Sequence, residues 1–180
     1  MGWILIIILG FITLILGFVY FSNLIGLIWT AVPYVPLSKK QLHGLQEAIK
    51  LNHDDKLVDL GCGDGRVLRL FEKQGVEVCE GYEINFWAAT RCKLTNKILK
   101  SKTKCFVKDF NKVDLSQYNV AFCYLLPSCL KKIRDKLFRE LKHGSRIISY
   151  GFEIPGVAAS QIIYTNEKRP TLGRIFVYVV

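Results

Sequence analysis

The chain has 180 residues, a length that suggests one folded domain with an appended segment. Its formal net charge of +10 is compatible with binding to nucleic acid, to anionic lipid or to an acidic partner, and also with a basic domain kept soluble by its charge. No RNA-binding aromatic motif or dense basic tract supports nucleic acid. Its six cysteines form no CxxC pair and have no histidine at metal-ligand spacing, which argues against zinc and disulfides and predicts buried, reduced thiols.

Residues 1–32 are predicted to be a membrane anchor. No Asp, Glu, Lys, Arg or His precedes Ser38, and the apolar stretch 3–21 would form roughly 28 Å of helix at ~1.5 Å per residue, which is long enough to cross a hydrocarbon core. A cleaved signal peptide is the alternative, but a basic n-region and a convincing cleavage site are missing. Because Lys39 and Lys40 are the first charges, the positive-inside rule predicts a single-pass protein with its domain on the cytoplasmic or matrix side.

A second apolar stretch, residues 24–35, is too short to span a membrane alone. It would extend the first helix, lie in the membrane interface, or pack on the soluble domain, and the sequence leaves these alternatives open. All charged residues lie beyond Ser38, so the domain carries the whole net charge next to the anchor. This arrangement favours the headgroup surface of a bilayer as its electrostatic partner.

A linking segment precedes the domain. Ser38-x-x-Gln41 is a capping-box start, and the apolar residues that follow it at helical spacing predict a short amphipathic helix that ends near Asn52. We therefore assign residues 33–53 to a linker with this helix and residues 54–180 to the folded domain.

Strand-like and helix-like segments alternate along the domain. The predicted strands are residues 56–60, 76–84, 104–108, 119–126, 146–152, 161–165 and 174–180. The predicted helices are residues 65–74, 86–100 and 128–141. This alternation predicts a Rossmann-like, doubly wound α/β fold with a seven-stranded, mostly parallel sheet whose last strand is antiparallel.

A glycine-rich turn follows the first predicted strand. Gly61, Gly63 and Gly65 let the backbone swing sharply and approach a ligand closely, and the helix start behind them offers unpaired N–H groups. The spacing G-x-G-x-G differs from the dinucleotide fingerprint G-x-G-x-x-G, because Arg66 stands where the third glycine is expected. The turn therefore predicts a nucleotide-type cofactor, and which one it is depends on the residues around it.

An acid stands at the end of each of the first three strands. Asp59 can face a cationic ligand group, Glu83 can accept two ribose hydroxyl bonds, and Asp109 can accept an exocyclic amine beside the ring of Phe110. Three carboxylates suit S-adenosylmethionine, whose amine and sulfonium are positive, and they suit a pyrophosphate badly. The predicted cofactor is therefore S-adenosylmethionine.

At this point the chain resembles the class I, seven-strand S-adenosylmethionine-dependent methyltransferases. More narrowly, it is similar to the membrane-associated protein-lysine methyltransferases that, in mitochondria, modify the ATP synthase c-subunit and the adenine nucleotide translocase. The segments that carry the resemblance are PYVP (33–36), VDLGCGDGR (58–66), GYEINFW (81–87), KDFNKV (108–113), YNVAFCYLLP (118–127), KLFREL (136–141) and SRIISYGFEIP (145–155). PYVP and GYEINFW are the specific parts.

The resemblance implies that Asp59 orients the methionine amine, Glu83 binds the ribose, and Asp109 with Phe110 holds the adenine, with no metal. It also implies that the loop around the cofactor is made by Gly61, Cys62, Gly63 and Gly65. The family often has serine, proline and tryptophan where this chain has Cys62, Phe86 and Phe110.

Tyr124 and Pro127 are the predicted substrate-side residues, although Tyr124 is equally compatible with a core aromatic. They belong to the tail of the fourth strand, YLLP, which differs from the family's usual residues. No catalytic acid or base stands out, because methyl transfer mainly requires that the partners be positioned and the nucleophile be uncharged.

Three functions remain open from the sequence. The first is a membrane-anchored methyltransferase that modifies a lysine of a membrane protein. The second is a methyltransferase for a lipid, quinone or other hydrophobic small molecule. The third is a membrane scaffold that binds the cofactor without turnover.

Overall fold

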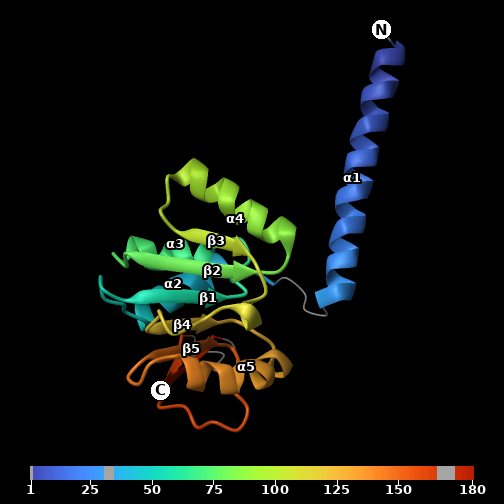
Figure 1. The fold of residues 1–180 in the computed structure, drawn as a ribbon. Helices are drawn as coiled ribbons and strands as arrows, with labels where there is room; N and C mark the ends of the chain where they lie inside the picture. Colours follow the sequence, from blue (N-terminus) through green and yellow to red (C-terminus); the bar gives the residue numbers. More distant parts are fainter. Residues whose placement is uncertain (1, 31–34, 166–172) are drawn as a thin grey trace. The chain divides into compact units, whose positions relative to one another are not determined.

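The computed structural model describes residues 2–30, 35–165 and 173–180, without the side chains of residues 22–30. The chain divides into two compact units, Met1–Pro33 and Tyr34–Val180. Figure 1 shows the first unit as a single helix and the second as a sheet with helices.

The first unit is helix α1, which spans Gly2–Thr30. Its part Gly2–Phe21 is long and apolar enough to cross a membrane by length and composition, and its side chains are not buried. Residues 24–30 of the second apolar stretch continue this helix, whereas residues 31–34, with Pro33 and Tyr34, lie outside the described residues.

The second unit contains seven strands in one sheet. The strands are β1 (Lys56–Leu60), β2 (Val78–Glu83), β3 (Lys104–Val107), β4 (Val120–Cys123), β5 (Arg146–Tyr150), β6 (Gln161–Tyr164) and β7 (Arg174–Val179). Their order is β3-β2-β1-β4-β5-β7-β6, and β7 runs antiparallel to both of its neighbours. The predicted doubly wound sheet with an antiparallel last strand is confirmed.

Four helices and one short turn of helix complete this unit in the described part of the chain. They are α2 (Lys39–Ala48), α3 (Arg66–Lys73), α4 (Phe86–Leu99), η1 (Phe110–Lys112) and α5 (Pro127–Glu140). Figure 1 shows α2 and α3 behind the sheet and α5 in front of it. The sheet is therefore covered on both faces, as a mostly parallel sheet requires.

Alternating strand residues divide the interior into two apolar clusters. On β1, Leu57 belongs to the cluster under α2, α3 and α4, and its neighbour Val58 belongs to the cluster under α5. Successive side chains of a strand point to opposite faces, so a continuous apolar run fills both layers. This is why the central strands read as unbroken hydrophobic segments in the sequence.

Helix α2 starts as predicted but ends earlier. The Ser38 hydroxyl accepts from the backbone N–H of Gln41, and the Gln41 side chain accepts from the backbone N–H of Ser38, which is the expected capping box. The helix stops at Ala48 rather than near Asn52, because Ile49 is extended and turns its side chain into the core. The helix thus belongs to the compact unit that begins at Tyr34.

Several strands are shorter than the apolar runs that predicted them. The fourth strand stops at Cys123 although the apolar run continues to Leu126, and the fifth stops at Tyr150 although the run continues to Phe152. Beyond these points the chain leaves the ladder and bends over the carboxyl edge of the sheet. The residues that follow these two strands therefore start at the carboxyl edge, where ligands bind in such sheets.

Candidate active site

The glycine turn lies at the point where the strand order reverses. Strand β1 pairs in parallel with β2 on one side and β4 on the other, so the chain after Leu60 emerges between two diverging connections. Gly61, Gly63 and Gly65 all adopt positive φ angles of 83°, 55° and 75°. Only glycine enters this region freely, so the turn depends on all three.

Glu83, at the end of β2, is tied to this turn. Its Oε2 accepts a hydrogen bond of 2.9 Å from the backbone N–H of Gly63, and its Oε1 accepts one of 2.7 Å from the backbone N–H of Asn85. A carboxylate has about four acceptor positions, so two remain for ligand hydroxyl groups. The carboxylate is therefore fixed in position and retains binding capacity.

Asp59 lies inside the strand before the turn and is only 3% exposed. Burial, followed by the negative charge of Glu83, raises the pKa of its carboxyl group well above the ordinary value. No hydrogen bond or ion pair of the described residues reaches its carboxylate. A buried acid without a partner is costly, and a cationic ligand group would stabilise it.

The other acid of the turn has a different role. Asp64 forms a two-point ion pair with Arg66, with Nη2–Oδ2 and Nε–Oδ1 distances of 2.6 and 2.8 Å. Burial opposes ionisation of Asp64, but the hydrogen bonds and charge of Arg66 outweigh it and hold its pKa below the ordinary value. Arg66 also donates to the backbone carbonyl of Leu37, which is buried ahead of α2. Through its bonds to Asp64 and Leu37, Arg66 therefore connects the turn to the segment that precedes α2.

The side chain of Cys62 faces the core. Its Sγ lies 3.3 Å from the Sγ of Cys105, and Cys92 belongs to the same buried cluster. Hydrogen bonding with these two cysteines, together with burial, raises the pKa of the Cys62 thiol. A Cβ on Gly81 would stand 2.5 Å from the Cβ of Cys62, so only glycine fits opposite it. Contact between Cys62 and a cofactor would therefore have to come from its backbone.

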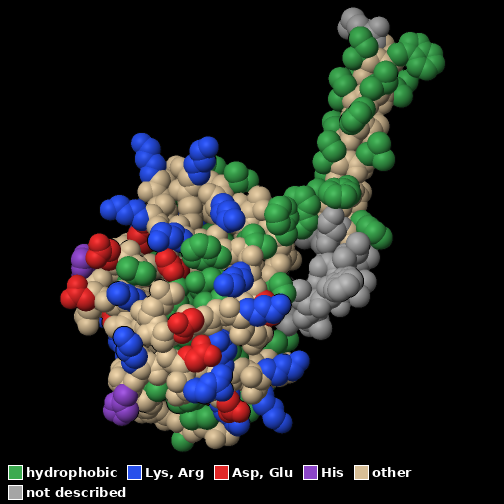
Figure 2. Space-filling view, viewed as in Figure 1, with side chains coloured by type: hydrophobic (Ala, Val, Ile, Leu, Met, Phe, Trp, Pro, Cys, Tyr) green, Lys and Arg blue, Asp and Glu red, His purple; other side chains and the backbone are tan. Residues whose placement is uncertain are grey.

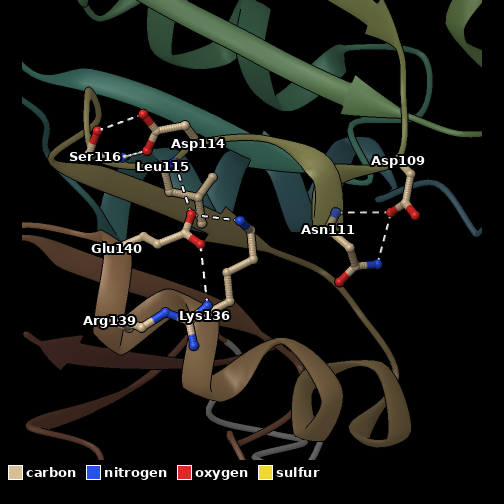
Figure 3. A network of polar contacts seen from close by, with 8 residues as sticks. All are labelled: Asp109, Asn111, Asp114, Leu115, Ser116, Lys136, Arg139 and Glu140. Atoms are coloured by element: carbon tan, nitrogen blue, oxygen red, sulfur yellow. Dashed lines mark hydrogen bonds and ion pairs between the residues drawn. The ribbon is translucent and has the colours of Figure 1, made fainter.

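Asp109 and Phe110 follow the end of β3. Figure 3 shows Asp109 and Asn111 facing each other, and Oδ1 of Asp109 accepts from the backbone N–H and the side-chain Nδ2 of Asn111 at 2.9 and 2.8 Å. Asp109 thereby caps the short helix η1, and its other carboxylate oxygen, Oδ2, takes no part in these two bonds. Phe110 packs against the apolar cluster under α5. The sequence pattern did not predict η1, because three residues are too few to show helical periodicity.

The segment after η1 is fastened to α5. Figure 3 shows Glu140 at the centre of these contacts, with Oε2 accepting from the backbone N–H of Leu115 at 3.2 Å and from Nζ of Lys136 at 2.6 Å. The connection that carries Phe110 is thus attached to α5 at Leu115.

A cavity opens at the same edge of the sheet, next to the ends of β4 and β5. Its volume is about 290 Å³, and its lining residues are Pro127, Gly151, Phe152, Glu153, Pro155, Arg174 and Phe176. Among the two predicted substrate-side residues, Pro127 lines this cavity. Tyr124 is half-buried with its ring centroid 5.5 Å from that of Tyr150, in an edge-on contact.

Arg174 and Glu153 give the cavity one charge of each sign, and the sequence pattern predicted neither. The guanidinium of Arg174 lies 5.5 Å from the ring centroid of Phe176, and its buried Nε has no hydrogen-bond partner within the described part of the chain. Arg174 starts an antiparallel strand that reaches the site from the far end of the chain. No local pattern marks such a residue.

The exposure predicted for the histidines and the burial predicted for the cysteines agree with the structure, apart from one cysteine. His43, His53 and His143 are exposed, and five of the six cysteines are buried. The features gathered at one edge are therefore a glycine turn, two buried acids on adjacent strands, a third acid next to an aromatic residue, and a cavity lined by apolar residues and one charge of each sign.

Comparison with known proteins gives the same picture. Residues 59–161 match the family model described as the ANTKMT methyltransferase domain. A solved RNA methyltransferase from Salinibacter ruber, in complex with S-adenosyl-L-homocysteine, is 26% identical with a TM-score of 0.70 and covers 81% of this chain and 94% of its own.

Three curated relatives carry lysine methyltransferase names. A protein-lysine N-methyltransferase from Saccharolobus islandicus is 30% identical over 152 residues, which cover 83% of this chain and 94% of the relative. The mouse adenine nucleotide translocase lysine N-methyltransferase is 34% identical and the human lysine N-methyltransferase of the ATP synthase c-subunit 30%, each over 126 residues that cover 69% of this chain. The chain spans about half the length of these two relatives, 55% and 53%. The fold, the family match and these relatives together show that the chain belongs to the ANTKMT methyltransferase domain family of S-adenosylmethionine-dependent enzymes.

Proposed function

We propose that this protein is a membrane-anchored protein-lysine methyltransferase that modifies a membrane protein. The names of its relatives support lysine as the acceptor, and two of those names specify a component of ATP synthase and a translocase. The apolar helix α1, whose part Gly2–Phe21 has the length and composition of a membrane span, supports the anchor. A tethered enzyme meets a lysine near the bilayer at raised effective concentration.

The site residues fit S-adenosylmethionine. The observation that carries this fit is Asp59, a buried carboxylate that no described residue pairs, standing on the strand next to the one that ends in Glu83. In this proposal Asp59 binds the amine of the methionine part, Glu83 the ribose hydroxyls, and Asp109 with Phe110 the adenine. When bound, the cofactor supplies a methyl group on a sulfonium.

The glycine turn would hold the cofactor by its backbone. Gly61, Gly63 and Gly65 leave the backbone of the turn without side chains that would keep a ligand at a distance. Cys62 would contribute only its backbone. The hydrogen bond between Gly63 and Glu83 keeps the turn in register with the ribose-binding acid.

An acceptor lysine must lose its proton before it can attack. A free lysine with a pKa of ~10.4 is protonated at neutral pH, and an apolar site favours its neutral form. The cavity beside the ends of β4 and β5 offers such surroundings through Pro127, Phe152 and Phe176, with Glu153 at its wall. We assign Pro127 and Tyr124 to the substrate side of the site.

Methyl transfer to parent membranes tests this proposal. The purified full chain is incubated with these membranes and methyl-labelled cofactor, after which protein, lipid and RNA are separated. We expect label in a protein band that yields methyl-lysine on hydrolysis. The label should disappear with Glu83→Ala and persist with Glu77→Ala, which removes the same charge from an exposed position.

The other functions give different results. Label only in the lipid fraction would replace a protein acceptor by a hydrophobic small molecule. Label only in the RNA fraction would favour the activity named for the Salinibacter ruber structure. Cofactor binding without any transfer would leave a cofactor-binding scaffold.

A further inference from the structure

The charges of the domain are unevenly distributed. Residues 84–108 contain seven of the 25 Lys and Arg residues and none of the 15 Asp and Glu residues. These residues form helix α4 and the edge strand β3, which we call the α4–β3 face. Its basic residues are Arg91, Lys93, Lys97, Lys100, Lys102, Lys104 and Lys108.

The same face exposes apolar side chains. On α4, Leu94 and Ile98 are 58% and 79% exposed and lie four residues apart, so they share one side of the helix. Leu99 is 58% exposed next to them. Figure 2 shows Lys and Arg side chains with apolar side chains between them over the part of the domain where Figure 1 places α4.

The exposed apolar side chains do not belong to the core. The core side of α4 is made by its small and polar residues, namely Ala88, Ala89, Cys92 and Asn96. Asn96 accepts from Arg69 and donates to the carbonyl of Thr103, which fixes the rotation of the helix. Leu94 and Ile98 therefore stay on the outer side of a firmly held helix.

Most of the cations on this face form no ion pair within the described part of the chain. Glu80 pairs with Lys104 at 3.1 Å, and Glu72 accepts from the backbone N–H of Lys102 and the hydroxyl of Ser101. No ion pair of the described residues includes the side chains of the other six basic residues, which are Arg91, Lys93, Lys97, Lys100, Lys102 and Lys108.

We propose that the α4–β3 face is a second membrane-binding element that docks the domain on anionic phospholipid headgroups. Lysines on an edge strand ordinarily protect it from pairing with other strands, which would account for Lys104 on β3 and Lys108 just beyond it but not for exposed aliphatic residues on a helix. Lys and Arg around exposed apolar side chains are the pattern of interfacial helices, whose cations bind headgroups while the apolar side chains enter the acyl boundary.

Nucleic acid fits this face less well. Proteins that bind single strands stack bases on free aromatic rings. On this face the ring of Phe106 is already stacked on Tyr82 and that of Phe86 packs edge-on with Trp87. The exposed apolar side chains in the second half of α4 are the aliphatic Leu94, Ile98 and Leu99. The lipid surface matches both the charge and the aliphatic character.

Docking here would affect the active site. Helix α4 starts three residues after Glu83, and both Ile84, in the connection, and Phe86, the first residue of the helix, are exposed. A bilayer against this face would bring the ribose side of the cofactor site towards the headgroups. Docking through this face would orient the domain in the same way whatever the methyl acceptor is.

Lysine footprinting of the full chain tests the docking. The protein is reconstituted in nanodiscs of phosphatidylcholine, with or without phosphatidylglycerol, and its lysines are acetylated and counted by mass spectrometry. Helix α1 is present in both, so the comparison isolates the headgroup charge. We expect severalfold protection of Lys93, Lys97 and Lys100 only in the anionic nanodiscs, and no change at the exposed lysines 131, 132 and 142.

Matched variants separate local docking from net charge. The triple variant K93E/K97E/K100E should lose the protection that is read at Lys102 and Lys108, whereas K131E/K132E/K142E, with the same charge change, should keep it. The double variant L94Q/I98Q should lower the protection with the charge unchanged. Thermal melts confirm that each variant is folded, and K93Q/K97Q/K100Q replaces the first triple if it is not.

Two results would overturn the inference. Equal labelling of the face in both kinds of nanodisc would show that it does not bind anionic lipid. Protection by added RNA, but not by phosphatidylglycerol, would assign the face to nucleic acid. Neither result bears on methyl transfer, which is measured separately.

Discussion

The backbone N–H of Gly63 donates a 2.9 Å hydrogen bond to the carboxylate of Glu83. This bond joins the turn after β1 to the end of β2, two segments that meet only because their strands are paired. The second oxygen of Glu83 accepts from Asn85, whose side chain caps α4 by accepting from the N–H groups of Trp87 and Ala88. A single carboxylate therefore holds the glycine turn and the start of a helix in fixed relation.

Replacing Glu83 with Gln should weaken cofactor binding strongly. Glutamine offers one acceptor oxygen, so either the turn or the ribose loses a charged hydrogen bond worth about 1.5–3 kcal/mol, which corresponds to roughly 10- to 100-fold in affinity. Titration calorimetry with S-adenosylhomocysteine measures this. Glu77→Gln is the control, because Glu77 is exposed. Equal affinities for all three proteins would remove Glu83 from the cofactor site.

Asp59→Asn should abolish cofactor binding but stabilise the ligand-free protein at neutral pH. Because the folded protein holds the Asp59 proton more tightly than the unfolded chain does, its free energy of unfolding falls as pH rises from the ordinary pKa of 3.8 towards the raised folded pKa. Asparagine does not titrate, so the variant escapes this loss.

Thermal melts from acid to neutral pH test this dependence. The melting temperature of Asp59→Asn should exceed that of the wild type increasingly as pH rises. Asp54→Asn, at a fully exposed position, should follow the wild type. A variant that becomes less stable than the wild type at neutral pH would contradict the raised pKa.

Gly81→Ala should destabilise the domain by about 1–3 kcal/mol, the usual cost of overpacking. The added Cβ would stand 2.5 Å from the Cβ of Cys62 and 2.8 Å from Cδ1 of Leu68, both within the core. Chemical denaturation measures the loss. Gly17→Ala in α1, where a Cβ meets nothing within 4 Å, should leave the unfolding of the domain unchanged. An unchanged free energy of unfolding for Gly81→Ala would contradict this prediction, because it would mean that the turn moves away from the added methyl group without cost.

Arg174→Gln should raise the KM for a protein substrate without changing the affinity for S-adenosylhomocysteine. The cavity that Arg174 lines includes no residue of the glycine turn. A hydrogen bond from its guanidinium to substrate is worth about 1.5–3 kcal/mol, so KM should rise roughly tenfold or more. Arg139→Gln, on the exposed side of α5, is the control. A proportional loss of cofactor affinity would place Arg174 in the cofactor site instead.

The sequence by itself determined the positions of the strands and of the acids at their ends. Val58, Asp59 and Leu60 lead into alternating glycines, and both signals act within a few residues, where backbone sterics and side-chain periodicity decide the structure. The mostly parallel order followed from the alternation of strands and helices.

Only the tertiary structure decided which distant groups meet. Arg66 reaches the carbonyl of Leu37, Cys62 meets Cys105, and Arg174 closes a cavity with Pro127, each across dozens of residues. Such contacts depend on strand order and packing, which no local pattern encodes. Likewise, only the structure shows that Leu94 and Ile98 of α4 face away from the core. Local chemistry thus predicts where a site begins, and packing decides what completes it.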